Sequence, residues 1–283
     1  ADIESEMQEI YGINLSTSAI SNITNKDSQA ATEWQNRPLD SLYMIVWMDG
    51  IVFKVRENGK VINKTVYLCV GLNKEGLKEV LGMWIGKNES AAFWMGVLTD
   101  LKARGVEDIL ITVTDNLNGF TETIKSVFPA STTQICVVHQ IRNSCRYVVW
   151  KEKKEFTADL KNIYNAPTKE AAEMELDNFE QKWGAKYPYA IRSWRNNWEE
   201  LTVFFDFPVE IRKIIYTTNL IENLNGKIRK YTKNKLSFPN DDALKKSVYL
   251  AINEIEKKWY QPIWNWALIF NQFITIFENR IQV

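Results

Sequence analysis

The sequence predicts a mixed α/β fold that is interrupted by a long all-helical segment. Three observations lead to this class. Apolar segments within residues 42–72 read as strands joined by an Asn-Gly turn, helices and strands then alternate as far as residue 138, and helical periodicity continues to residue 207. With 45% hydrophobic and 25% charged residues, the composition excludes a disordered chain and a small disulfide scaffold.

Charge and cysteine content narrow the class of protein further. The 35 lysines and arginines balance 35 acids, which excludes a uniformly basic protein but not nucleic-acid binding, because binding depends on where the charges lie. Three cysteines cannot all pair, and no apolar run is long enough to span a bilayer, so we expect a reduced, cytoplasmic protein. The chain begins at Ala1 inside an expected helix, which suggests a truncated N-terminus.

The first forty residues are expected to form a partial helix-turn-helix followed by a linker. Residues 3–10 place apolar side chains on one helical face, Gly12 suits a helix end, and residues 16–23 fit a second short helix. Such a unit can bind DNA, but a plain helical hairpin fits the same pattern equally well. Residues 27–40 are polar and contain Pro38, as expected of a linker.

An antiparallel ribbon of strands is expected next. Residues 42–48 form an apolar run that ends before an Asp-Gly pair, and residues 51–56 alternate apolar and polar side chains as a second strand. Asn58-Gly59 supplies a tight hairpin turn. Residues 61–72 and 80–85 then continue the ribbon as a third and a fourth strand.

Helices and strands alternate after this ribbon. Ser90 can cap a helix over residues 90–104, and residues 108–114 form a strand that is apolar on both faces, as in a sheet covered by helices. A second helix over residues 118–128 and a strand over residues 133–138 follow. This order predicts a sheet with an antiparallel side and a parallel side.

The rest of the chain is expected to be helical. After His139, helical periodicity continues to residue 207, and the mixed charges of residues 152–180 are typical of a solvated bundle face. One long helix is expected over residues 209–235. A final Trp-rich helical region over residues 241–278 is expected to pack on the sheet.

Two of the expected strands end in a carboxylate. Asp49 closes the first strand, and Asp115 closes the strand over residues 108–114. If these strands are neighbours, the two carboxylates converge and repel each other unless they are protonated or bridged by a cation, for which Mg²⁺ and Mn²⁺ are suited. Two ordinary strand-end aspartates would give the same pattern.

The helix expected over residues 209–235 is basic and holds a single acid between Arg212 and Lys235. The cations in this window are Arg212, Lys213, Lys227, Arg229, Lys230, Lys233 and Lys235. The acid is Glu222, which lies one residue from the apolar stripe of the helix, beside Asn219 and Asn223. Glu222 can simply pair with a neighbouring cation, but a lone acid among cations also suits a metal ion that faces a phosphate backbone.

Five segments carry a resemblance to a known family. They are residues 54–59, 80–86, 105–110, 136–144 and 216–225. Together they resemble the Mutator-type transposases of bacterial insertion sequences, which belong to the DDE transposases and have an RNase H-like core. The resemblance covers nearly the whole chain.

The resemblance implies a division of the chain into four parts. Residues 1–40 would be the partial helix-turn-helix and linker, and residues 41–143 the first part of the RNase H-like core. Residues 144–207 would be an all-helical insertion domain, and residues 208–283 the second part of the core with the C-terminal helices. The insertion accounts for the long separation between the second and the third acid.

The resemblance also assigns chemistry to the acids. Asp49, Asp115 and Glu222 would be catalytic and would hold two Mg²⁺ or Mn²⁺ ions for phosphoryl transfer, with Asp49 bridging both ions. The protein would cleave DNA at the terminal inverted repeats of a transposon and join the 3′-hydroxyl ends to target DNA. It would act as a homodimer at the nucleoid in the bacterial cytoplasm. The alternatives are an RNase H-like nuclease that does not join DNA and a domesticated regulator that only binds it.

DNA contacts are expected from cations, amides and one tryptophan. The candidates are Arg142, Arg192, Arg195, Trp198, Asn219, Asn223, Lys227, Arg229, Lys230 and Lys233. Trp198 and its neighbour Trp194 lie four residues apart among arginines and could stack on an unpaired base. Burial of both rings in the bundle core is the favoured alternative.

Cys136 and His139 form a Cys-x-x-His pair where the last strand meets the helical segment. A zinc site would also need Cys69 or Cys145, without regular spacing, so we favour a structural or DNA-positioning role. The resemblance makes the pair a family signature near the active site.

Overall fold

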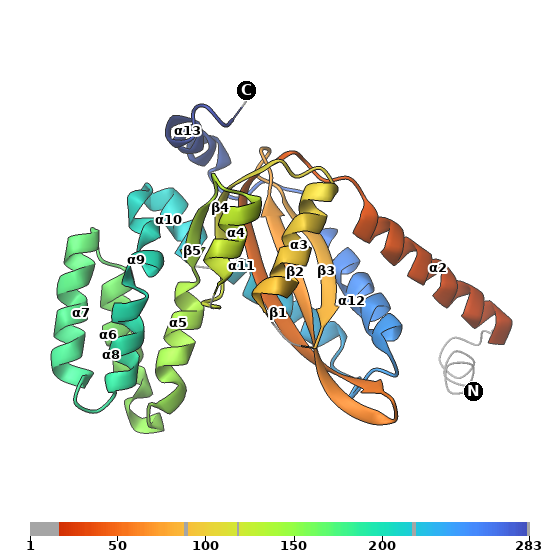
Figure 1. Ribbon diagram of the computed structural model, residues 1–283, viewed down its shortest axis with the longest axis horizontal. Coiled ribbons are helices and arrows are strands. Elements are labelled where there is room, and N and C mark those ends of the chain that lie inside the picture. Colours follow the sequence, from red (N-terminus) through yellow and green to blue (C-terminus); the bar gives the residue numbers. More distant parts are fainter. Residues whose placement is uncertain (1–16, 88–89, 118, 217–218, 282–283) are drawn as a thin grey trace.

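The centre of the molecule is a five-stranded mixed sheet with the order β3-β2-β1-β4-β5 (Figure 1). The computed structural model describes residues 17–87, 90–117, 119–216 and 219–281. Strands β1, β2 and β3 pair antiparallel, whereas β4 pairs parallel with β1 and with β5. The predicted α/β class, with an antiparallel and a parallel side to the sheet, is therefore confirmed.

The antiparallel side consists of three strands. They are β1 (Leu42–Glu57), β2 (Lys60–Leu72) and β3 (Lys78–Gly86). The predicted hairpin turn is confirmed, since Asn58 and Gly59 have φ angles of 50° and 77°, as a turn with two left-handed residues requires. The predicted break after Met48 is wrong, because β1 continues through Asp49 and Gly50, which pair with Leu68 and Tyr67 of β2.

The parallel side consists of β4 (Asp108–Thr114) and β5 (Thr132–Ile135), with helices α3 (Ala91–Ala103) and α4 (Phe120–Val127) in the connections. Both helices cover one face of the sheet, which is the near face in Figure 1, and Trp94 of α3 stacks on Phe120 of α4 at 4.6 Å between ring centroids. The predicted cap is present, since Ser90 accepts a hydrogen bond from the backbone N–H of Phe93 at 3.1 Å. Helices on both faces explain why β4 is buried on both sides from Ile109 to Thr114.

The other face of the sheet is covered by α11 (Asn219–Tyr231) and α12 (Asp241–Glu256), and α2 (Thr17–Asn36) packs against α12 and β3. Helix α2 continues to Asn36, so the prediction of a linker from residue 27 is wrong for its first ten residues. The predicted helix over residues 3–10 lies outside the described residues, and the helix-turn-helix stays a prediction.

Three other predicted boundaries are wrong. The strand predicted over residues 133–138 ends at Ile135, because β4 ends at Thr114, whose carbonyl accepts the last backbone hydrogen bond, from Cys136. The helix predicted over residues 209–235 ends at Tyr231; it is described as α10 (Val209–Tyr216) and α11, and residues 217–218 between them lie outside the described residues. The helical region predicted over residues 241–278 is divided into α12 and α13 (Trp266–Ile276) by a segment that contains Pro262.

The segment after β5 is all-helical, as predicted, and lies beside the parallel edge of the sheet (Figure 1). Its elements are α5 (Val137–Ser144), the 3₁₀ turn Cys145–Tyr147, α6 (Trp150–Tyr164), α7 (Lys169–Trp183), α8 (Pro188–Asn196), α9 (Trp198–Leu201) and the 3₁₀ turn Val203–Asp206. Phe156, Phe179 and Trp183 fill its interior, where Phe156 contacts each of the other two rings edge to face. None of the helices in the described ranges is long and apolar enough to cross a membrane.

Candidate active site

The register of the parallel strands brings Asp49 and Asp115 together. The last β1–β4 pair joins Trp47 to Val113, and each aspartate lies two residues beyond that pair. Asp49 therefore lies within β1 rather than at its end, but it does lie where the parallel pairing stops. The prediction that the two carboxylates converge is confirmed, because ligand atoms of Asp49, Asp115 and His139 all lie within 4.8 Å of one another.

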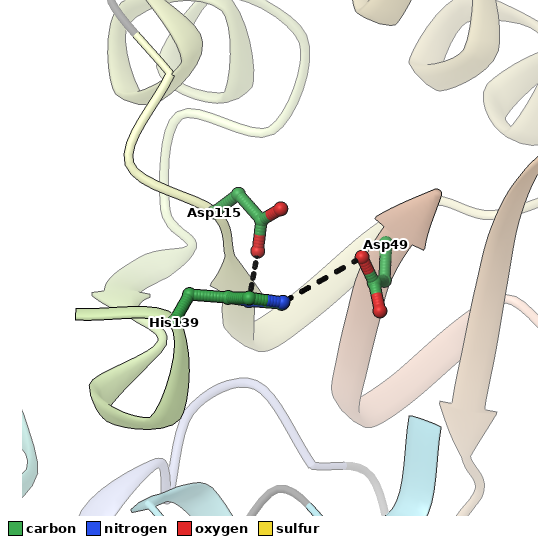
Figure 2. A group of neighbouring side chains, drawn as sticks. All are labelled: Asp49, Asp115 and His139. Carbon is green, nitrogen blue, oxygen red and sulfur yellow. Dashed lines mark ion pairs between the residues drawn. The ribbon is translucent and has the colours of Figure 1, made fainter. Parts of the chain in front are cut away.

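His139 lies between the two carboxylates (Figure 2). It belongs to the first turn of α5, which begins at Val137 directly after Cys136. Its Nδ1 forms an ion pair with Oδ1 of Asp115, and its Nε2 lies 3.9 Å from Oδ1 of Asp49. Because α5 begins at Val137, where the sequence predicted a strand, His139 lies on a helix at the sheet edge. The sequence pattern did not show that His139 would contact the aspartates.

Helix α11 brings Glu222 and Asn225 to the same place. Asn225 donates a hydrogen bond from Nδ2 to Oδ2 of Asp49 at 2.6 Å. Glu222, one turn earlier on the same helix, pairs with the guanidinium of Arg142 at 2.8 Å. Arg142 also lies 3.5 Å from Nε2 of His139, so Glu222 joins the group of charged side chains through Arg142.

Asn225 was not among the residues selected from the sequence. The available signal was its spacing, because Asn225 lies three residues after Glu222 and therefore on the same flank of an α-helix. The direction of α11 relative to β1 was needed to show that this flank faces Asp49.

The site places like charges close together in a partly buried setting. The pKa of Asp49 is raised to about 6. Burial is the largest cause, and the neighbouring carboxylates of Asp115 and Glu222 act in the same direction, whereas His139 and the Gly50 N–H lower the pKa. Burial alone would lower the pKa of His139, but hydrogen bonds to Asp115 and Cys136 raise it to about 11. His139 is thus an imidazolium near neutral pH and balances part of the negative charge.

The donor set fits a hard divalent cation. Carboxylate oxygens of Asp49 and Asp115 converge beside His139. Asn225 contacts Asp49 through its amide nitrogen, and its buried Oδ1 accepts no hydrogen bond from any described residue. Mg²⁺ and Mn²⁺ prefer such oxygen ligands. Within the described ranges, the group that could hold a metal consists of Asp49, Asp115 and His139, and the structural role of Cys136 stays a prediction.

The predicted DNA contacts on α11 lie mostly on its exposed surface. The side chains of Asn223, Lys227, Arg229 and Lys230 are exposed, as is Lys233 just beyond the helix. The side chain of Asn219 lies outside the described residues. A groove between α11 and α12 is lined by Lys227, Lys230, Tyr231 and Lys258, with Glu254 and Ile255.

The predicted contacts in the helical segment are divided. Arg142 and Arg192 are exposed, although Arg142 pairs with Glu222, and Arg195 is held by ion pairs with Asp177 and Glu180. Trp198 is buried at 8% exposure in the bundle core, so its ring is closed to stacking in this structure. The favoured alternative for the tryptophans, core packing, is therefore the one observed.

Comparisons with solved structures and with known sequences differ in strength. Similarity to solved structures is low. A Mos1 transposase paired-end complex with the left transposon end aligns over 67% of this chain and 70% of that chain, at 12% identity and a TM-score of 0.19, which is too low to carry an argument about fold.

Sequence relatives are much closer. A probable transposase for an ISRM3-like insertion sequence element of Sinorhizobium fredii is 43% identical over 280 residues, which cover 99% of this chain and 70% of the relative. The transposase for insertion sequence element ISRM3 of Rhizobium meliloti matches with the same identity and coverage. A probable insertion sequence transposase of Corynebacterium diphtheriae is 39% identical over 91% of this chain and 75% of its own length. The profile of the family described as "Transposase, Mutator family" matches residues 1–262, and the chain therefore belongs to the Mutator family of transposases.

Proposed function

We propose that this chain is a DDE-type transposase with an RNase H-like core, which cleaves DNA at the terminal inverted repeats of its element and joins the 3′-hydroxyl ends to target DNA. The observation that supports this most is the convergence of Asp49 and Asp115 at the end of the parallel β1–β4 pair, with the helix of Glu222 against it. The strand order β3-β2-β1-β4-β5 and the all-helical segment after β5 are consistent with the core and the insertion domain expected from the family resemblance.

Each side chain of the site has a role in this proposal. Asp49, Asp115 and Glu222 would hold two Mg²⁺ or Mn²⁺ ions, which when bound supply an activated water and stabilise the leaving oxygen. His139 holds the two aspartates close together before ions enter, because its positive charge offsets their repulsion. Asn225 fixes the orientation of the Asp49 carboxylate, and Arg142 holds Glu222.

DNA would lie across the exposed flank of α11. This helix presents Lys227, Arg229 and Lys230 to solvent, and Lys258 of the neighbouring segment adds a further cation to the α11–α12 groove. Such a concentration of cations is noteworthy in a chain of zero net charge, and phosphate binding explains it. Two transposon ends must be held together for joining, so we propose that the protein works as a homodimer at the nucleoid, in the cytoplasm.

Replacement of Glu222 by glutamine tests the reaction. We expect Glu222→Gln to lose cleavage and joining by at least about 10²-fold, because one group that stabilises transition-state charge is removed, while duplex binding is retained. The assay uses a labelled duplex that ends in the element's own terminus, with and without Mg²⁺, and a second duplex that is already cut. Glu173→Gln, on the exposed surface of α7, is the matched control.

Three outcomes of this assay would contradict the proposal in different ways. Normal cleavage by Glu222→Gln would remove Glu222 from the active site. Cleavage without joining of the pre-cut end would identify a nuclease. DNA binding by the wild-type protein without any Mg²⁺-dependent reaction would identify a regulator.

The ion pair between Arg142 and Glu222 leads to a further prediction. In the metal-free site Arg142 competes with a cation for the Glu222 carboxylate, so Arg142→Gln should bind Mg²⁺ more tightly. The pair is partly exposed and is worth up to about 1 kcal/mol, which corresponds to a decrease of up to about 5-fold in the Mg²⁺ concentration at half-maximal thermal stabilisation. Arg146→Gln, which removes the same charge farther from Glu222, is the control. A higher midpoint for Arg142→Gln would show that Arg142 supports the ions.

A further inference from the structure

Exposed aromatic rings lie beyond the active site, on the helical segment. Tyr147, Trp150 and Tyr189 are exposed by 63%, 86% and 50%. Three exposed arginines lie near them in sequence, namely Arg142, which also pairs with Glu222, Arg146 and Arg192. We propose that these six residues, the aromatic–arginine surface, bind unpaired nucleotides of a DNA strand next to the scissile phosphate. The inference rests on the proposed function and names a substrate feature that the catalytic acids alone do not require.

Helix α5 connects this surface to the active site. His139 and Arg142 lie on α5, and Arg146 and Tyr147 follow in the 3₁₀ turn at its end. Along a helix at 1.5 Å per residue, Tyr147 lies about 12 Å beyond His139. This length corresponds to about three to four base steps of 3.4 Å. In Figure 1, α5 leads away from the sheet edge toward α6 and α8, so a strand that leaves the site along α5 reaches these rings.

Two rings of this surface contact each other. Tyr147 of the 3₁₀ turn packs edge-on against Tyr189 of α8, with ring centroids 5.4 Å apart and an angle of 86°. The guanidinium of Arg146 lies 5.6 Å from the centroid of the Tyr147 ring. Trp150 lies three residues further on, in the first turn of α6. Their exposure leaves ring faces available to solvent, and base stacking on such faces is favourable and tolerant of sequence.

The core of the bundle does not account for these rings. Trp194 is buried and donates a hydrogen bond from Nε1 to Oγ of Ser144 at 2.9 Å, and Phe156 and Trp183 lie within the hydrophobic core. Stacking on an unpaired base, which the sequence pattern allowed for Trp194 and Trp198, is thus assigned to the exposed rings.

Charge favours a nucleic acid over an apolar partner. Arg146 lies over the Tyr147 ring, Arg192 lies three residues after Tyr189 on α8, and the nearby acid Glu152 is already paired with Lys186 and Tyr187. Aromatic faces can stack only on bases that are released from the duplex, so the expected ligand is an unpaired segment rather than intact double-stranded DNA.

Binding of a forked DNA tests the inference. The full chain is titrated, without divalent metal, with a blunt duplex and with a duplex of the same length whose last four or so base pairs are splayed apart. The splayed strand carries 2-aminopurine, whose fluorescence falls when the base stacks on a ring. We expect the wild-type protein to prefer the fork and to quench the probe.

The variants should separate stacking from general DNA binding. Trp150→Ala and the double variant Tyr147→Ala/Tyr189→Ala should each lose about 10-fold of the fork preference, as expected for the loss of base stacking, with duplex affinity unchanged. Tyr147→Phe/Tyr189→Phe keeps the ring faces and should keep the preference. Trp264→Ala is the control, because Trp264 is 88% exposed and lies outside the helical segment. Circular dichroism and the melting temperature show that each variant is folded.

Several outcomes would overturn the inference. Equal binding of fork and duplex by the wild-type protein, or an unchanged fork preference in both alanine variants, would remove the stacking role while leaving the proposed function intact. A change from dimer to monomer in the alanine variants, measured by light scattering, would assign the surface to self-association instead. Failure of the wild-type protein to bind either DNA would contradict the proposed function itself.

Discussion

Replacement of Asp49 by asparagine is expected to abolish Mg²⁺-dependent DNA cleavage while leaving the metal-free protein folded and at least as stable as the wild type. Asp49 is 6% exposed and is the carboxylate nearest to the centre of the site, between His139 and Asn225. Asparagine keeps its shape but removes the charge that would bind a cation. We expect a loss of about 10³-fold or more in cleavage rate, the upper end of the effect of removing one electrostatic group.

The stability of this variant follows from the pKa of Asp49. The folded protein raises that pKa to about 6 from an ordinary value of 3.8, so the ionised form destabilises the folded state above about pH 6 and costs nothing below about pH 4. Removing the charge should therefore stabilise the metal-free protein at pH 7.5 by up to about 3 kcal/mol. This gain in stability is reduced because His139 loses a counter-charge. The gain should disappear at about pH 4, where Asp49 is already protonated in the folded protein.

Thermal unfolding with and without Mg²⁺ provides the measurement. A ligand present at about 100 times its Kd stabilises a protein by about 2.7 kcal/mol, so Mg²⁺ should raise the melting temperature of the wild type but not of Asp49→Asn. In the wild type the effect should weaken below about pH 6, because protons then compete with the ion for Asp49. Asp206→Asn, at an exposed acid in the helical segment, is the control. Equal stabilisation of both proteins by Mg²⁺ would place the ions elsewhere.

The sequence predicted the acids of this site because they mark the ends of regular patterns. Asp115 follows the last residue of an apolar strand, and Asp49 interrupts one, so the hydrophobic pattern alone located both. Their convergence depended on β1 and β4 being neighbours, which the sequence pattern left open and the parallel pairing of the two strands shows. Glu222 was conspicuous as the single acid in a basic window.

The supporting residues could not be predicted because they depend on how elements cross. Asn225 meets Asp49 only because α11 lies on β1, and His139 meets Asp115 only because β5 ends at Ile135 and α5 begins early. The local sequence pattern also predicted a strand break that the structure does not have. An Asp-Gly pair usually ends a strand, but here Gly50 stays paired, and a Cβ at that position would approach Thr65 to 2.7 Å. Long-range pairing thus overrode the turn preference.

Neutralising the exposed cations of α11 should weaken DNA binding without affecting its sequence preference. Lys227, Arg229 and Lys230 are exposed on α11, the helix that also carries Glu222. In the triple variant to glutamine, three phosphate contacts are lost. The plot of log affinity against log salt concentration has a negative slope, and its magnitude should become smaller by about 3, or roughly 0.9 for each lost contact. We expect the affinity near physiological salt to fall by about 10- to 100-fold for all duplexes alike.

A matched variant distinguishes contact from mere charge. Lys151, Lys153 and Lys154 lie in the first two turns of α6. Their triple replacement by glutamine removes the same net charge at a different place. If DNA crosses α11, the two triple variants should differ, with the larger loss of slope for the α11 variant. Equal losses would mean that long-range charge rather than local contact governs binding. A loss confined to the α6 variant would move the duplex to the helical segment, and Glu222 would then have to be reached from that side.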